Sequence, residues 1–215
     1  MGSKRTRPKQ LELLPLESDP EAVFRRQGIV LLAGVDEVGR GPLAGPVVAA
    51  AVILPEKSEF PGLTDSKLLT QARREFFDQQ VRKQALSFAI QEVGVTEIEA
   101  LGIWQASLKA MAMAVQQLLP TPELVLIDGP WRLPVALAQQ PVVKGDQRCQ
   151  TIAAASVLAK VYRDQQMESY HLLYPHYNFA SHKGYATREH LESLRRWGPC
   201  PVHRRTFKGV KEWCR

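Results

Sequence analysis

Apolar residues gather in short runs along the chain, and the first of these runs ends in charge. Residues 29–35 are rich in Ile, Leu and Val and predict a buried strand, which leads directly into Asp36 and Glu37. A second, valine-rich run covers residues 47–54, and the connection between the two contains the turn-forming sequence Gly39-Arg40-Gly41-Pro42. So short a connection predicts two antiparallel neighbours with the acidic turn between them.

Three further segments have the composition of strands, and the other periodic segments predict helices. The expected strands are 88–95, 123–127 and 141–143, and the second of them ends at Asp128-Gly129. Each expected helix has a start or stop signal in the sequence. The helices are 21–27, with Ser18 and Glu21 as a capping box and Gly28 as the stop; 71–85, capped by Thr70; 96–119, opened by Thr96 and Glu99; 152–174; and one from Thr187 onward.

Length and composition favour a soluble protein with one domain or a domain with appendages, and the expected strands and helices together indicate the α/β class. The chain has 215 residues, of which 45% are hydrophobic, enough to bury a substantial core. No apolar run could cross a bilayer, and the first residues lack a secretory signal, so we expect a cytoplasmic protein that does not bind membranes. The cysteines Cys149, Cys200 and Cys214 are widely spaced and predict neither a disulfide framework nor a zinc site.

The net charge of +6 favours an anionic partner such as nucleic acid. Part of this excess lies in a basic N-terminal tail, residues 1–17, which we expect to be disordered. The tail therefore says little about a binding site.

Four acids are candidates for one site: Asp36 and Glu37 after the first strand, Asp128 after a later strand, and Asp164 within the long helix. Such acids can share a site only if cations neutralise their repulsion, and oxygen ligands suit Mg²⁺ or Mn²⁺ better than zinc. Two ions at such a site could support phosphodiester cleavage. Taken singly, two of the acids have simpler explanations, because Asp128 could be a turn residue and Asp164 could pair with Lys160 one helical turn away.

Several ordered motifs resolve this choice by resemblance to a known family. Residues 34–48, GVDEVGRGPLAGPVV, closely resemble the opening motif of ribonuclease HII, the type 2 ribonuclease H family. Later blocks resemble those of the family in the same order: Thr64-Asp65-Ser66-Lys67, Ile127-Asp128-Gly129, Lys144-Gly145-Asp146 with residues 152–164, His182-Lys183-Gly184-Tyr185-Ala186-Thr187, and His203-Arg204-Arg205-Thr206-Phe207. The resemblance spans about residues 29–207.

The resemblance implies a ribonuclease H-like fold, a mixed five-stranded sheet surrounded by helices, in a catalytic domain of residues 18–207 followed by a short segment, 208–215. It implies a monomeric endoribonuclease that cuts the RNA strand of RNA–DNA hybrids and incises duplex DNA at embedded ribonucleotides. Asp36, Glu37 and Asp128 resemble its metal-binding catalytic acids, with Mn²⁺ or Mg²⁺ as cofactor, and Asp164 resembles a fourth acid on the helix.

The resemblance also implies a substrate-binding set. The turn Gly39-Arg40-Gly41 and Tyr185 are expected at the ribonucleotide, where close backbone approach can sense a 2′-hydroxyl. Lys67 and Lys144 are expected to contact phosphates, since each lies beside a turn within a motif block. We interpret Asp65 and Asp146 as helix caps rather than catalytic acids. His182 and His203 receive no role.

Two alternatives remain open at the level of sequence. One is a non-catalytic module that binds hybrids through its basic surface and Tyr185. The other is a different nuclease or strand-transfer enzyme on the same fold, because a fold with an acidic cluster does not by itself choose a substrate.

Overall fold

Five strands form one mixed sheet within residues 19–214, the part of the chain that the computed structural model describes. The strand order is β3-β2-β1-β4-β5, in which β1 runs antiparallel to β2 and parallel to β4. The strands are β1 (Leu32–Val38), β2 (Val47–Ile53), β3 (Ser87–Val93), β4 (Leu124–Asp128) and β5 (Gln139–Val142). The expected mixed five-stranded sheet is therefore confirmed.

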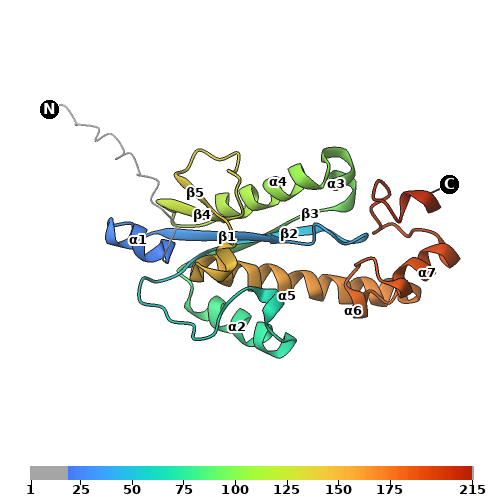
Figure 1. Cartoon of the computed structure of the whole chain (residues 1–215), viewed down its shortest axis with the longest axis horizontal. Coiled ribbons are helices and arrows are strands. Elements are labelled where there is room, and N and C mark those ends of the chain that lie inside the picture. The colour runs from blue at the N-terminus through green and yellow to red at the C-terminus, as the bar shows by residue number, and fades with distance from the viewer. Residues whose placement is uncertain (1–18, 215) are drawn as a thin grey trace.

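Helices cover both faces of this sheet, with α4 on one side and α5 and α2 on the other (Figure 1). The α-helices of the described residues are α1 (Pro20–Arg26), α2 (Gln71–Gln84), α3 (Val95–Leu101), α4 (Ile103–Gln116), α5 (Gln150–Leu173), α6 (Phe179–His182) and α7 (Arg188–Trp197). Short 3-10 helices cover Ser66–Leu68, Gly145–Gln147, Pro175–Tyr177 and Lys211–Trp213. No helix in residues 19–214 is both long and apolar enough to cross a membrane.

The start of α5 lies directly against β1 because small residues face each other there. A Cβ atom on Gly34 would stand only 2.4 Å from the backbone nitrogen of Ile152, so only glycine allows this approach. Ala154 and Ala155 of the same helix are fully buried in the core below the sheet. This contact fixes α5 under the strand that carries Asp36 and Glu37.

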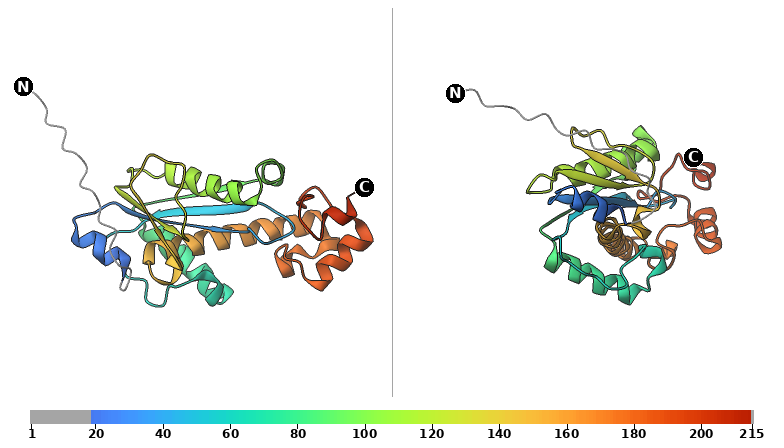
Figure 2. Two further views of the ribbon diagram at one scale, coloured as in Figure 1. Left: turned by 45° about the horizontal axis from the view of Figure 1, so that its top comes forward. Right: turned by 60° about the vertical axis from the view of Figure 1, so that its left-hand side comes forward.

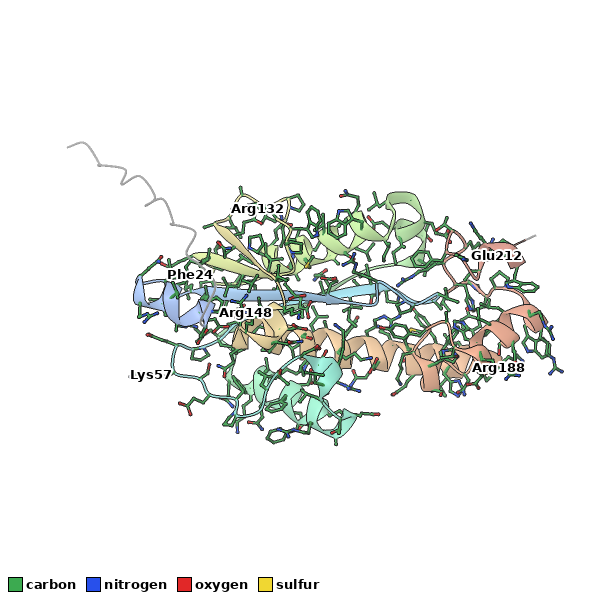
Figure 3. The ribbon with its side chains drawn as sticks, viewed as in Figure 1. Phe24, Lys57, Arg132, Arg148, Arg188 and Glu212 are labelled. Carbon is green, nitrogen blue, oxygen red and sulfur yellow. The ribbon has the colours of Figure 1, made fainter. Side chains whose placement is uncertain are left out.

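The chain after α5 forms a separate small core at one end of the molecule (Figure 2). Phe179, Leu194 and Val210 are fully buried there against Leu43 of the β1–β2 connection. Arg188 and Glu212 lie at this end, and Phe24 of α1 lies at the other (Figure 3). The segment beyond residue 207 thus takes part in the packing of the domain.

The structure corrects several predicted boundaries. The first strand extends to Val38, so both acids lie within β1 rather than after it. The helix predicted over 96–119 is divided into α3 and α4 at Gly102, whose φ of 78° no helix accommodates. Asp19 caps α1 by accepting from the amide of Glu21, while Ser18 and the basic tail lie outside the described residues. The caps predicted at Thr70 and Thr187 are confirmed.

Candidate active site

The carboxyl ends of β1 and β4 bring three of the predicted acids to one edge of the sheet. These strands are parallel neighbours, and Val35 pairs with Ile127. Asp36 and Asp128 are the next residues of the two strands and therefore lie side by side. Asp36 is buried and accepts a 2.7 Å hydrogen bond from the amide of Glu37. Asp128 accepts a 2.7 Å hydrogen bond from the amide of Gly145.

A fourth acid of this edge is Asp146, which we had interpreted as a helix cap. It lies in the 3-10 helix after β5, which is itself parallel to β4, so the chain returns to the same edge. Asp146 is buried and interacts with Asp128 and with Asp65. It forms no cap: α5 begins after Cys149 without any side-chain cap bond. Asp65 does cap, as predicted, by accepting from the amide of Lys67.

Burial and mutual repulsion raise the pKa values of three of these acids. Burial, with Glu37 and Asp128 next, raises the pKa of Asp36 well above its usual value. Burial also raises the pKa of Glu37, although Arg40 opposes the rise. For Asp146, burial and the charges of Asp128 and Asp65 raise the pKa to about 6. A cation bound beside these acids would offset their repulsion.

Lys67 is the cation that the chain itself supplies to these acids. Although burial lowers it, the pKa of Lys67 is raised overall by Asp65, Asp36, Asp146 and Asp128. Lys144 is exposed beside the same site, in a left-handed conformation with φ of 55°. Both predicted phosphate-binding lysines therefore border the acid cluster.

Asp164 is not brought to this cluster. One of its carboxylate oxygens is 2.6 Å from the ammonium nitrogen of Lys160, and the other is 3.9 Å from a guanidinium nitrogen of Arg74 on α2. The acid cluster lies beside Ser156, whose hydroxyl bonds to that of Ser66 next to Asp65. Asp164 comes eight residues later, about 12 Å further along the helix axis. The structure thus supports the simpler explanation that the i, i+4 spacing offered, and it differs from the expectation of a fourth catalytic acid on the helix.

Two buried arginines brace the Gly39-Arg40-Gly41 turn from behind. Arg204 is fully buried and donates to four backbone carbonyls, those of Gly39, Arg40, Pro42 and Gly45, at 2.6–3.0 Å. Arg163 of α5, also fully buried, donates to the carbonyls of Ala44, Pro46 and Lys183. The guanidinium of Arg204 is therefore occupied inside the protein and is not available to a phosphate.

The fold requires glycine at only one of the two glycine positions of the turn. Gly39 has φ of 94°, and a Cβ there would stand 2.3 Å from Nε of Arg163, so the fold itself requires glycine. Gly41 has no such constraint: an added Cβ would meet only Cε1 of Tyr185, at 3.6 Å. Tyr185 is 43% exposed. The Tyr185 ring is therefore the nearest group to the open side of Gly41.

Arg40 extends from this turn between an acid and an aromatic ring. Its guanidinium is 3.3 Å from a carboxylate oxygen of Glu37 and 5.0 Å from the centre of the Trp104 ring. Trp104 in turn meets the half-exposed Trp131 edge to face. Trp104 was not recognised in the sequence, because a lone aromatic at the start of a helix gives no signal of what covers it.

The donor set suits a hard divalent cation, since every acid offers oxygen and none has a histidine or thiol partner. Within residues 19–214, however, no group of three or more His, Cys, Asp or Glu side chains could hold one metal ion as it stands. Asp36 and Asp128 each direct one carboxylate oxygen to a backbone amide.

A mixed sheet with acids at the ends of its parallel strands, beside a braced turn, defines a nuclease-like active site. The family model for ribonuclease HII matches residues 33–210, and the chain belongs to the ribonuclease HII family. It is therefore an endoribonuclease, a hydrolase that acts on RNA in RNA–DNA hybrids. This membership sets aside the alternative of a non-catalytic binding module. The family depends on divalent metal ions.

Relatives and solved structures agree with this assignment. The chain is 46% identical over 211 residues to ribonuclease HII of Syntrophobacter fumaroxidans, covering 98% of this chain and 89% of the relative. It is 48% identical over 193 residues to that of Bacillus subtilis, covering 90% and 75%. The crystal structure of ribonuclease H2 from Pyrococcus horikoshii superposes with a TM-score of 0.75 at 25% identity, covering 84% of this chain and 95% of that one. Ribonuclease HII of Archaeoglobus fulgidus, solved in complex with PCNA, gives 0.70 at 28% identity, covering 83% and 95%.

Proposed function

We propose that this enzyme both degrades the RNA strand of RNA–DNA hybrids and incises duplex DNA on the 5′ side of an embedded ribonucleotide, leaving a 3′-hydroxyl and a 5′-phosphate. The observation that carries the proposal is the open side of Gly41, where the nearest side-chain atom to an added Cβ is Cε1 of Tyr185, in a turn whose Arg40 pairs with Glu37. An open glycine next to a phenol can approach a sugar closely enough to detect a 2′-hydroxyl. A single ribonucleotide would suffice for that recognition.

Four acids would hold the metal in this proposal: Asp36, Glu37, Asp128 and Asp146. Asp146 replaces Asp164 in this set, because it is the one that interacts with Asp128. Mn²⁺ or Mg²⁺, when bound, would activate a water and stabilise the leaving oxygen of the cleaved phosphodiester. The four carboxylates would contribute by holding the ion, whose positive charge would offset the negative charge of the phosphate.

The side chains around the acids would orient the polyanion. Lys67 and Lys144 border the cluster and would bind phosphates on either side of the cleaved bond. Arg40 would exchange its contact with Glu37 for a phosphate while Trp104 continues to support its guanidinium. Binding should accordingly weaken as salt concentration rises.

Cleavage of four matched duplexes tests the proposal: all-DNA, all-RNA, hybrid, and DNA with one ribonucleotide. We expect cleavage of the last two with Mg²⁺ or Mn²⁺ and none in excess EDTA, with the single incision 5′ of the ribonucleotide. Gly41→Ala should fold normally, because its Cβ meets only an ordinary contact, but should lose most activity on the single-ribonucleotide duplex. Full activity of this variant, or equal cleavage of all-DNA, would contradict the proposal.

Two further expectations accompany this function. The monomeric state can be checked by sedimentation, and the cytoplasmic location by fractionation of cells. Both remain predictions.

A further inference from the structure

Three buried histidines form a connected group behind Tyr185. His182 at the end of α6, His190 of α7 and His203 of the C-terminal segment are each at most 8% exposed. The rings of His182 and His190 are stacked with centroids 4.4 Å apart, and Nε2 of His190 lies 3.0 Å from Nε2 of His203. None of these side chains reaches the acid cluster, so cleavage itself leaves them without a role.

The hydrogen bonds at the far end of the group fix where each proton lies. The amide of Cys200 donates to Nδ1 of His203 at 3.0 Å, so this nitrogen carries a lone pair and the ring proton is on Nε2. That Nε2–H then donates to Nε2 of His190, which must be unprotonated. The proton of His190 is therefore on Nδ1, from which it donates to the carbonyl of Tyr185 at 2.8 Å.

His182 is fixed in the same way by different partners. The amide of Gly184 donates to its Nδ1 at 3.2 Å, so its proton is on Nε2 and donates to the carbonyl of Tyr177 at 2.6 Å. All three rings are thereby assigned as neutral, each in one tautomer. Burial, the main cause, lowers the pKa of all three, that of His190 to about 4 and that of His203 to about 3, which agrees with neutral rings.

The segment that these histidines hold is the one that carries Tyr185 to the active site. The amide of Tyr185 donates to the carbonyl of His182, and its own carbonyl accepts from His190. The preceding carbonyl, of Gly184, accepts from the amide of Leu43 in the β1–β2 connection at 2.8 Å. Both polar groups of the Tyr185 backbone are thus held inside, while its partly exposed side chain is the nearest one to the open side of Gly41.

We propose that His203 and His190 form a one-directional hydrogen-bond relay, from the amide of Cys200 to the carbonyl of Tyr185, that positions the Tyr185 phenol for recognition of the ribonucleotide. His190 is the positioning residue of this relay. His182 supports it by stacking on His190 and by holding the amide of Tyr185 through its own carbonyl. The inference rests on the proposed role of Tyr185 as the side chain that reads the sugar.

Asn and Leu at position 190 provide a matched test, because the two side chains have nearly the same shape. The Asn amide can donate to the Tyr185 carbonyl in place of Nδ1–H, whereas Leu cannot, and both lose the bond to His203. The readout is the selectivity ratio, the affinity for a duplex with one ribonucleotide divided by that for the same all-DNA duplex, measured in EDTA. We expect His190→Leu to lower this ratio about tenfold and His190→Asn to lower it by less than about threefold, in line with the loss of one positioning hydrogen bond.

Controls separate positioning from general damage. His176→Leu removes an exposed histidine that stacks on Trp197 and should leave the ratio unchanged. Equal ratios for His190→Leu and the native enzyme, or equal losses for His190→Leu and His190→Asn, would overturn the relay. If His190→Leu fails to fold, ring ¹⁵N chemical shifts of the native protein at pH 7.5 test the relay instead. We expect an Nδ1–H tautomer for His190 and Nε2–H tautomers for His182 and His203. Any other assignment overturns the relay.

Tyr185→Ala distinguishes failure of the relay from failure of the proposed function. If Tyr185→Ala abolishes the selectivity ratio and His190→Leu does not, Tyr185 reads the sugar without help from the relay. If Tyr185→Ala leaves the ratio unchanged, the role of Tyr185 in recognition is refuted, and the positioning inference falls with it.

Discussion

Replacing Asp146 with Asn should stabilise the metal-free protein and abolish cleavage in the same variant. Burial and the charges of Asp128 and Asp65 raise the pKa of Asp146 from 3.8 to about 6. A carboxyl group whose pKa is higher in the folded protein destabilises the fold at neutral pH, and this cost disappears as the pH falls through 6 toward 3.8. Asn removes the charge, retains the shape, and can still donate a hydrogen bond to Asp65.

The expected size of the effect follows from that pKa. The rise corresponds to about 3 kcal/mol above pH 6, at 1.36 kcal/mol for each pH unit. Because relaxation of the protein weakens such charge interactions, the expected effect is about 1–2 kcal/mol. A protein of this length gains about 2–4 °C in melting temperature for each kcal/mol, so Asp146→Asn should melt about 2–8 °C higher than the native protein at pH 7.5 in EDTA.

Thermal melts in EDTA and initial cleavage rates with Mg²⁺ measure the two halves of this prediction. Asp164→Asn is the matched control: it breaks the ion pairs with Lys160 and Arg74, so it should be less stable by about 1 kcal/mol but should retain most of the activity. Added Mg²⁺ should raise the melting temperature of the native protein and of Asp164→Asn more than that of Asp146→Asn. An active Asp146→Asn, or a folded but inactive Asp164→Asn, would refute the assignment of the acids.

Three other predictions concern the parts that support the site. Gly39→Ala should lower the free energy of unfolding by about 3 kcal/mol, because the positive φ disfavours alanine and the hydrogen-bonded Arg163 leaves no room for Cβ. Urea denaturation measures this loss, and a loss below about 1 kcal/mol would argue against a rigid turn. Arg204→Met should lower the free energy of unfolding by about 4 kcal/mol in the same assay, because four carbonyls lose their donor. A near-neutral effect would mean that water replaces the guanidinium. Acidification from pH 8 to pH 5 should remove about 2 kcal/mol of unfolding free energy for each of His190 and His203, because their pKa values lie below that of the unfolded chain and the unfolded state binds more protons in this window. Protonation of Asp146 opposes part of this loss, so urea melts of Asp146→Asn across the range measure it. Stability that did not fall would contradict the buried neutral rings.

The strands and three of the site acids could be predicted because their signals are local. An apolar run that ends in Asp36 or Asp128 predicts a buried strand with a charge at its end. Parallel pairing of the two strands then brings the two acids together. Thr70 and Thr187 could be recognised as caps for the same reason, since a cap and its helix are adjacent in sequence.

Asp146 and Asp164 could not be placed from sequence, because their neighbours are distant along the chain. A carboxylate just before a long helix has the pattern of a cap, and only the position of β5 beside β4 puts Asp146 at the edge with Asp128. Asp164 lies in a motif block, yet its orientation on α5 turns it toward Arg74. Burial of Arg204 depends likewise on the carbonyl of Gly39, which lies 165 positions earlier.

The bracing of the Gly39-Arg40-Gly41 turn by Arg204 and Arg163 bears on the entropy of substrate binding. Because six backbone carbonyls of residues 39–46 already accept from these two guanidinium groups, the loop loses little conformational freedom when a duplex arrives. A preorganised loop also cannot adapt its shape to a sugar that does not fit. Rejection of deoxyribose would then come from stiffness as well as from a missing hydrogen bond, and the two arginines would act on fidelity without ever touching nucleic acid.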